Sequence, residues 1–450
     1  MATRKMRLGM SMRGIGYHPA AWRHPDVPAD GTLRIDHYVR NAQTAERGLF
    51  DMIFFADGIA IREKDLPRGS LARSGFELAE MEPLTLLPAL AMVTKHVGLV
   101  TTASTTYNEP YHLARKFATL DLISHGRAGW NIVTSWSDAE GRNFNRDKHL
   151  DYDTRYERAA EFVEVVKGLW DSWEPGALVY DRESGVFYDE GRMHELNHVG
   201  KHFKVKGPLN VAEMPQGRPV LFQAGAAGQG RDIAAQHAEV IYAAQDTIGD
   251  AKTYYDDVKG RLARHGRDWD DLKIMPALRP VVGRTRAEAQ AKFDELQELL
   301  DPMVGLARLY NEFGDLSGFD LDGQVPEPQG EPQVRSGAER ILARARRHNL
   351  TIRQLGRQLA GEGNSCVIGT AADVADRMEE WFTGGACDGF NITPNILPGG
   401  CDDFVELVTP ELQRRGLFRT AYEGRTLREN LGLKPHVNRY EAARRAAAAE

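Results

Sequence analysis

The sequence is poor in cysteine, has no long apolar run and has no excess of positive over negative charge. Its 450 residues contain three cysteines, Cys366, Cys387 and Cys401, and no CxxC pair, which favours reduced thiols. The longest apolar run, residues 84–93, is too short to cross a bilayer, and residues 1–10 lack the apolar region of a signal peptide. The net charge of −7 provides no basic excess for phosphate backbones. We therefore expect a cytoplasmic protein that binds neither nucleic acid nor membrane.

What the chain does contain is a repeated strand-then-helix pattern. Hydrophobic residues make up 42% and charged residues 27%, as in an ordinary globular protein. Its apolar runs are mostly continuous rather than alternating, which is typical of parallel strands covered on both faces. Eight such units predict an α/β fold, a (β/α)8 TIM barrel, with a doubly wound open sheet as the alternative. We expect the strands at residues 6–11, 51–56, 97–104, 128–135, 219–224, 239–244, 274–282 and 387–392.

Two segments interrupt this pattern and are interpreted as insertions. Residues 174–215 end in the alternating sequence HFKVKG, which predicts a hairpin. Residues 301–366 contain a stretch rich in proline and glycine, followed by two predicted short helices. We expect a single barrel domain over residues 1–450, with these two insertions and a helical tail from about residue 413.

An HExxH sequence at residues 194–198 matches the zinc-protease motif, which requires one helix to direct both histidines at the metal. Gly191 and Gly200 bracket this segment, and the residues after it alternate as in a strand. The sequence therefore favours loop histidines over a metal site, and we expect no metal.

A glycine-rich turn at residues 225–230 follows one predicted strand and opens a helix. Free backbone N–H groups at such a turn can bind a phosphate. The glycines are ordered GxxGxG, whereas a dinucleotide-binding unit carries GxGxxG. In a barrel, a phosphate here would belong to a mononucleotide at the carboxyl ends of the strands.

Several polar residues lie where a barrel places its site. Asp57 follows the second strand, although it could simply form a turn before Gly58. Asn131 stands inside an apolar strand and needs a hydrogen-bond partner in the core or on a ligand. Tyr152 and Tyr156 lie one turn apart near a helix start, where phenols can reach a phosphate or pack in the core.

His18 follows the first strand, among the aromatic residues Tyr17 and Trp22. An imidazole at a barrel mouth suits acid–base chemistry or the orientation of a ligand. It could equally be a loop histidine without a chemical role.

Together these residues resemble the bacterial luciferase superfamily of two-component, FMN-dependent monooxygenases, in its nitrilotriacetate and dibenzothiophene-sulfone monooxygenase branch. The resemblance covers most of residues 6–412. The matching stretches are HPAAWRHP, AERGLFDMIFFAD, ASTTYNEPYHLARKFATLDLISHGRAGWNIVTS, YDTRYERAAEFVEVVKGLWDSWE, HVGKHFKVKGPLN, PVLFQAGAAGQGRDIAAQHAEVIYAA and CDGFNI.

The resemblance implies a TIM barrel that receives reduced FMN from a separate NAD(P)H:flavin oxidoreductase. With O2 as cosubstrate, a C4a-(hydro)peroxyflavin would oxygenate a small organic substrate, of the xenobiotic or sulfur- and nitrogen-containing kind. A homodimer or homotetramer is also implied. Two alternatives are a deazaflavin-dependent oxidoreductase on the same barrel and a flavin-binding barrel without turnover.

The resemblance also assigns roles by motif position. Relatives often carry histidine where Tyr152 stands and two serines where Ala226 and Ala227 stand, so this chain lacks those hydroxyl donors. By motif position, the flavin ring and ribityl chain would be lined by Asp57, Ser104 and Asn131, and the phosphate by Tyr152, Tyr156, Ala226 and Ala227. From its place after the first strand, His18 is expected to be the catalytic residue, either as a proton donor or as a group that orients the substrate. Because the oxygenating flavin must be kept from water, the substrate pocket is expected to have walls and a lid formed by the aromatic residues Trp22, Tyr107 and Trp136 and by residues 301–366.

Overall fold

The computed structural model describes residues 4–61, 65–75, 79–224, 228–328, 335–362 and 365–448. Eight parallel strands pair in the order β9-β11-β1-β2-β3-β4-β7-β8, and β8 pairs with β9 to close the ring. The predicted barrel is confirmed, and the open sheet is wrong. All eight predicted strands are present: β1 (Arg7–Ser11), β2 (Met52–Phe55), β3 (Gly98–Ser104), β4 (Ala128–Val133), β7 (Val220–Gln223), β8 (Val240–Ala243), β9 (Lys273–Val282) and β11 (Gly389–Ile392).

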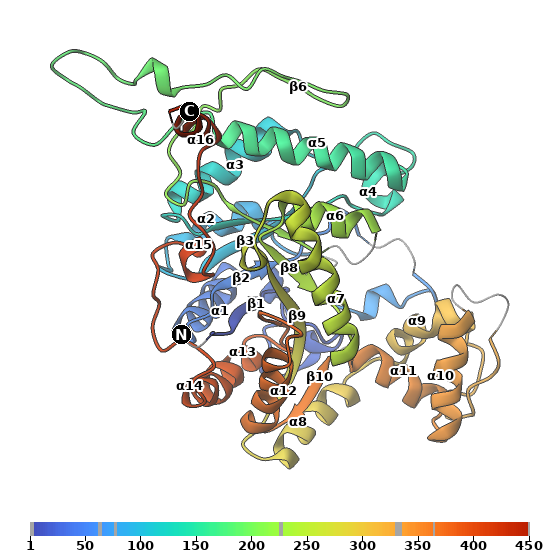
Figure 1. The fold of residues 1–450 in the computed structure, drawn as a ribbon. Coiled ribbons are helices and arrows are strands. Elements are labelled where there is room, and N and C mark those ends of the chain that lie inside the picture. The colour runs from blue at the N-terminus through green and yellow to red at the C-terminus, as the bar shows by residue number, and fades with distance from the viewer. Residues whose placement is uncertain are drawn as a thin grey trace.

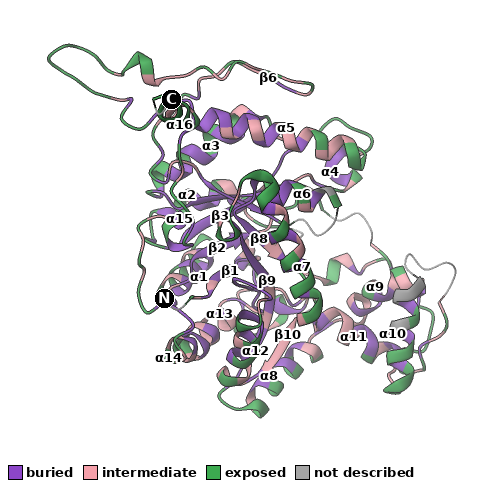
Figure 2. Cartoon of the chain, in the orientation of Figure 1, coloured by how far each residue is buried: buried purple, intermediate pink, exposed green. Residues whose placement is uncertain are grey.

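Helices cover the outer face of the strands (Figure 1). Burial is concentrated in the strands and on the helix faces turned toward them, as expected for a two-layer α/β barrel (Figure 2). Local sequence sets several helix starts, for example the N-cap Asp151, whose carboxylate accepts from the Thr154 N–H. The surrounding helices are α1 (Ile35–Arg47), α2 (Pro83–Ala91), α3 (Pro110–Ile123), α5 (Tyr152–Trp170), α6 (Gly228–His237), α7 (Ile248–Arg261), α8 (Arg286–Glu298) and α12 (Ala371–Thr383).

The amino-terminal end of the barrel is closed by the C-terminal segment. Leu427 and Leu431 pack with the inward-facing side chains Met52 and Val100. A Cβ atom on Gly98 would lie 2.4 Å from Leu427 Cδ1, so glycine is required where α15 (Leu427–Asn430) approaches the strand. The expected helical tail thus includes a plug for the barrel, which leaves the carboxyl ends of the strands as the place for a site.

The first insertion contains the predicted hairpin, formed by β5 (His198–Val199) and β6 (Lys204–Val205). In Figure 1 it forms an arm that extends away from the barrel. The HExxH segment is not one helix: His194 Nε2 lies 2.7 Å from Glu174 and His198 Nε2 lies 2.9 Å from Glu161. The two rings therefore face different carboxylates, in agreement with the interpretation as loop histidines.

The second insertion contains α9 (Pro302–Phe313) and the two predicted helices, α10 (Arg335–Arg347) and α11 (Ile352–Gly361), around their own apolar cluster. A strand that the sequence reading missed, β10 (Cys366–Gly369), follows and pairs with β9 outside the ring. The other elements are α4 (Asp138–Arg142), α13 (Gly399–Asp403), the π-helix η7 (Phe404–Val408), α14 (Thr409–Arg414), α16 (Arg439–Ala447), and the 3-10 helices η1 (Ala21–Arg23), η2 (Gly31–Leu33), η3 (Leu71–Arg73), η4 (Glu190–Arg192), η5 (Leu262–His265) and η6 (Trp269–Asp271).

Within the described ranges, no helix has both the length and the apolar character that crossing a membrane requires.

Candidate active site

Polar side chains line the barrel interior near the carboxyl ends of the strands. A Cβ atom on Gly9 would meet both Asn391 Oδ1 and Met52 Cε. Asn391 therefore faces the barrel interior, as the buried apolar side chain of Met52 does. Asn131 on β4 and Tyr242 on β8 also face the barrel interior. They lie level with the buried apolar side chains there, or nearer to the carboxyl ends of the strands. The oxygens Asn131 Oδ1, Tyr242 Oη and Asn391 Oδ1 are buried and have no hydrogen-bond partner among the described residues. Buried polar atoms normally have partners, so this end of the barrel fits a polar ligand.

Asp57, Ser104 and Asn131 lie along one side of this opening, at the ends of β2, β3 and β4. The Asn131 amide donates to Thr102 Oγ1 at 2.8 Å, which leaves its oxygen free to accept. The Ser135 hydroxyl donates to Glu140 at 3.0 Å, and its oxygen lies at hydrogen-bond distance, 2.9 Å, from Ser104 Oγ. The structure therefore brings these three predicted residues to one side of the mouth.

Asp57 is half-buried, and its pKa is raised to about 6 by desolvation and by the negative charges of Glu82 and Glu80. The folded state therefore holds the proton more tightly than the unfolded chain, whose Asp pKa is about 3.9. Stability contributed by this group is present below about pH 4 and is lost as pH rises to about 6.

We expect Asp57→Asn to raise the free energy of unfolding at pH 8 by about 1 kcal/mol, after allowance for solvent screening, and to leave it nearly unchanged at pH 4. The same variant should bind reduced FMN more weakly. Urea unfolding at both pH values and an anaerobic flavin titration would measure the two effects. Equal stability effects at pH 4 and pH 8 would contradict the assigned titration.

The predicted phosphate residues converge only in part. The Tyr152 hydroxyl lies 3.6 Å from the position of a Cβ on Gly228, so the start of α5 meets the start of α6. Tyr152 and Tyr156 have ring centroids 4.6 Å apart, and the Arg155 guanidinium lies over both rings. Ala226 and Ala227 lie outside the described residues. Arg155 was missed by the sequence reading, although its place within YDTRY could have suggested a cation for the phosphate.

His18 is 2% exposed and lies beside the end of β11, which is four strands from β4 in either direction around the ring. Its backbone N–H donates to the Asn395 carbonyl at 3.0 Å, and its Nδ1 accepts from the Ala20 N–H at 3.2 Å. The proton of the neutral ring is therefore on Nε2, which makes no hydrogen bond of ordinary geometry among the described residues but lies near enough to the Gln297 side chain for that group to raise the pKa of the ring. Burial and the charge of Arg279 lower the pKa of His18 to about 4.

The three predicted pocket residues occupy different surroundings. Trp22 is 36% exposed and packs against Gly75. Tyr107 is hydrogen-bonded to His149 Nδ1 at 2.5 Å and stacks on Phe144. Trp136 is 74% exposed. The structure therefore does not gather these side chains into one wall.

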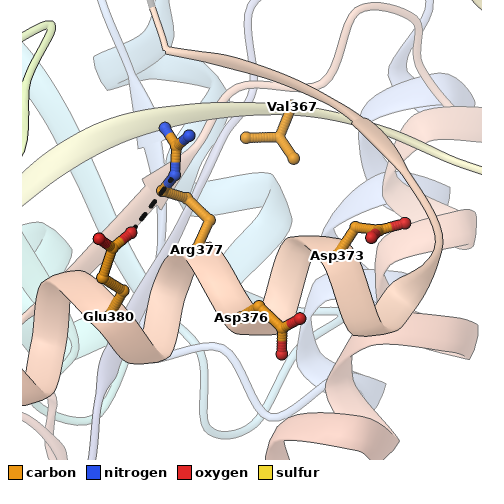
Figure 3. Close-up of a pocket in the computed structure, with 5 residues that line it drawn as sticks. All are labelled: Val367, Asp373, Asp376, Arg377 and Glu380. Atoms are coloured by element: carbon orange, nitrogen blue, oxygen red, sulfur yellow. Dashed lines mark ion pairs between the residues drawn. The ribbon is translucent and has the colours of Figure 1, made fainter.

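A separate pocket of about 420 Å³ lies beside α12 and β10, on the outside of the barrel (Figure 3). Its lining is mostly charged, and Arg377 is ion-paired with Glu380 at 4.0 Å. It contains none of the predicted site residues. Among the residues that the structure describes, no group of three or more His, Cys, Asp or Glu side chains is arranged to hold a metal.

The fold and the polar mouth define a class, a TIM-barrel enzyme that binds a polar cofactor at the carboxyl ends of its strands. Residues 18–387 match the family model described as luciferase-like monooxygenase. The chain therefore belongs to the luciferase-like monooxygenase family.

Individual relatives cover nearly the whole chain. It is 48% identical over 442 residues to N-acetyl-S-(2-succino)cysteine monooxygenase from Bacillus subtilis, covering 97% of this chain and 98% of that one. It is 47% identical over 440 residues to nitrilotriacetate monooxygenase component A from Aminobacter aminovorans, covering 96% and 97%. A solved riboflavin lyase with modified FMN and riboflavin is similar at a TM-score of 0.81 and 31% identity, covering 96% and 97%.

The chain is a monooxygenase that uses reduced FMN and O2, as the resemblance implied. Its residues fit that cofactor, because the ring of FMN presents N–H and C=O groups along a flat edge. The unpartnered oxygens of Asn131, Tyr242 and Asn391 can accept from such donors. The meeting point of α5 and α6 provides the N-terminus of α6 for a phosphate.

Proposed function

We propose that this chain is the oxygenase component of a two-component system. A separate NAD(P)H:flavin oxidoreductase supplies its reduced FMN, and the substrate is a small organic molecule with a nitrogen or sulfur centre. The observation that carries this proposal is the set of buried, unpartnered polar atoms at the barrel mouth. The relative named component A and the nitrogen and sulfur compounds in the relatives' names support it.

In this proposal the flavin lies on the β2–β4 side. Asp57, Ser104 and Asn131 line its ring and ribityl chain, whereas Tyr152 and Tyr156 hold the phosphate together with Ala226 and Ala227. Arg155 adds a positive charge next to the two phenols, which favours a phosphate there.

When bound, reduced FMN supplies the electrons that activate O2. The chain excludes water, because water in the site would divert the reduced flavin to H2O2. His18 is neutral near pH 7 and offers an Nε2–H, so it orients a reacting oxygen or the substrate as a hydrogen-bond donor. His18 could donate a proton or orient the substrate, and its low pKa supports orientation. That Trp22, Tyr107, Trp136 and the insertion at residues 301–366 enclose the substrate stays a prediction, which the separate surroundings of the three aromatic side chains do not support.

We further propose that residues 1–450 act as one domain and assemble as a homodimer or homotetramer in the cytoplasm. The arm of the first insertion supports the assembly, because it exposes apolar side chains that a second copy could cover. They include Val179, Tyr180, Phe187 and Val199. The three free cysteines are consistent with a reducing compartment.

Anaerobic titration followed by mixing with O2 tests the proposed function. Reduced FMN should bind, and addition of O2 with a generic flavin reductase and a panel of nitrogen and sulfur compounds should give oxygenated product. Binding and turnover with a reduced deazaflavin, without O2 uptake, would favour the hydride-transfer alternative. FMN binding without O2 uptake for any compound would favour a barrel without turnover.

A further inference from the structure

Arg279 is a cation in the barrel mouth without an anionic partner. It lies on β9 two residues beyond Ala277, whose strand neighbour is the inward-facing Asn391. Because side chains alternate along a strand, Arg279 faces the interior as Ala277 does. Its guanidinium carbon lies 5.7 Å from the centroid of the Tyr17 ring.

The surroundings of Arg279 do not neutralise its charge. Among the described residues, no carboxylate forms an ion pair with it, and its Nε is buried without a hydrogen-bond partner. The two titratable side chains that act on its charge are Tyr17 and Cys366. Burial raises the pKa of Tyr17, and it raises the pKa of Cys366 to about 11, so both are neutral near pH 7. A guanidinium removed from water without a counter-charge costs free energy, unless a ligand supplies the anion.

Two further donors lie beside Arg279. The Nε2–H of His18 makes no hydrogen bond of ordinary geometry, although the Gln297 side chain lies near it, and Arg279 is near enough for its charge to lower the pKa of that ring. Asn395 is 3% exposed, and neither polar atom of its amide has a partner. Its carbonyl accepts from the His18 N–H, so both residues belong to the same corner of the mouth. A fixed guanidinium with neighbouring N–H donors is the arrangement that binds carboxylates.

The flavin side of the mouth lies elsewhere. In the closed ring, β9 is four strands away from β3 in either direction, so Arg279 lies across the barrel from Ser104. The α5–α6 junction that suits the phosphate adjoins β4 and β7. The anion that Arg279 requires is therefore separate from the flavin phosphate.

We propose that Arg279, with His18 and Asn395 as further donors, binds a carboxylate of the substrate, so that the substrates of this enzyme are organic acids. This inference rests on the proposed function and specifies its substrate class. The negative edge of a reduced flavin ring offers similar chemistry, and the experiment separates the two sources.

Binding to flavin-free protein provides the first measurement. Calorimetry would compare acetate, succinate, tricarballylate and nitrilotriacetate with their methyl esters. We expect at least one acid to bind with a dissociation constant below about 10 mM, and its ester to bind at least about tenfold more weakly. Because no turnover is needed, this result does not depend on whether the enzyme oxygenates the probe.

Arg279→Gln should weaken binding of the acid by about tenfold to a hundredfold, the loss of a hydrogen bond to a charged group. Its dissociation constant for reduced FMN should stay within about twofold of the wild-type value. Arg279→Lys retains the charge and should keep part of the affinity, which separates a binding defect from misfolding. Arg40→Gln, on the exposed face of α1 where Arg40 pairs with Asp402, is the matched control and should change neither constant.

Equal binding of acid and ester, failure of all four acids to bind the wild-type protein, or full acid affinity in Arg279→Gln would overturn the proposal. Loss of reduced FMN affinity with unchanged acid affinity would instead assign Arg279 to the flavin. A protein that binds the acids but does not bind reduced FMN would refute the proposed function and leave the carboxylate site intact.

Discussion

Replacing His18 with alanine should lower the rate of product formation by about 10²- to 10³-fold, the usual range for loss of one positioned hydrogen-bond donor. The affinity for reduced FMN should stay within about twofold, because His18 lies beside the end of β11, across the ring from Asn131 on β4. Reduced flavin that is not used for oxygenation should appear as H2O2. A packing role would instead lower stability and leave coupling unchanged.

The protonation state of His18 adds a second readout. Nδ1 is occupied by the Ala20 N–H, so the neutral ring donates only through Nε2. The pKa of about 4 keeps this form dominant from pH 6 to pH 8. The contribution of His18 should therefore be constant over that range, whereas an imidazolium proton donor would lose activity as pH rises.

Single-turnover experiments with pre-reduced FMN would measure product and H2O2 together at pH 6, 7 and 8. His24→Ala is the matched control, since His24 lies in the same segment and contacts the backbone N–H of Asp26. It should retain wild-type coupling. Wild-type coupling in His18→Ala would remove His18 from the mechanism.

The sequence was sufficient to predict the barrel because its eight strands are buried on both faces and so form continuous apolar runs. β10 was missed because its four residues follow directly on an insertion and lie outside the ring. The plug was missed for a different reason. Leu427 belongs to a four-residue helix, and only its packing against Gly98 in the folded chain shows that its apolar side chains close the barrel.

A position at the barrel mouth could be predicted where a residue follows a strand, as His18 and Asp57 do, whereas their roles stay predictions. Arg279 and Tyr242 lie within or at the end of apolar runs, and only the closed ring shows that they face inward. Trp22, Tyr107 and Trp136 follow strands too, but loop geometry directs them to separate places. Side-chain direction beyond a strand end depends on tertiary contacts that no local pattern encodes.

Arg428→Met should destabilise the protein by up to about 3–5 kcal/mol at pH 7, because it removes the nearer of the two counter-charges of a buried carboxylate and leaves only Arg218, at 3.7 Å. Arg428 Nη1 and Nη2 lie 2.5 and 3.1 Å from the two oxygens of Glu239, and both residues are buried. Glu239 also accepts from the Leu221 N–H at 3.0 Å, so the pair ties α15 to the barrel. Loss of the pair therefore affects the plug and the strands together.

The effect should depend on pH in a defined direction. Desolvation opposes ionisation of Glu239, but the charges of Arg428 and Arg218 outweigh it and hold its pKa well below the usual range. A carboxyl with a lowered folded pKa contributes stability above its unfolded pKa of about 4.3, and that stability is lost as pH falls toward the folded pKa. Urea unfolding would measure the free energy of unfolding of wild type and Arg428→Met at pH 7 and at pH 4. We expect a large difference between the two proteins at pH 7. The difference should be smaller at pH 4, because the Glu239 carboxyl of the variant, which has lost Arg428, takes up a proton there. Arg425→Met, an exposed change in the same segment, should alter stability by less than about 0.5 kcal/mol. The double variant Glu239→Gln/Arg428→Met should recover part of the loss, because the buried carboxylate is then neutral and only the partly exposed Arg218 keeps its charge. If the double variant is less stable than Arg428→Met alone, the deficit comes from packing of the plug and not from the charge of Glu239.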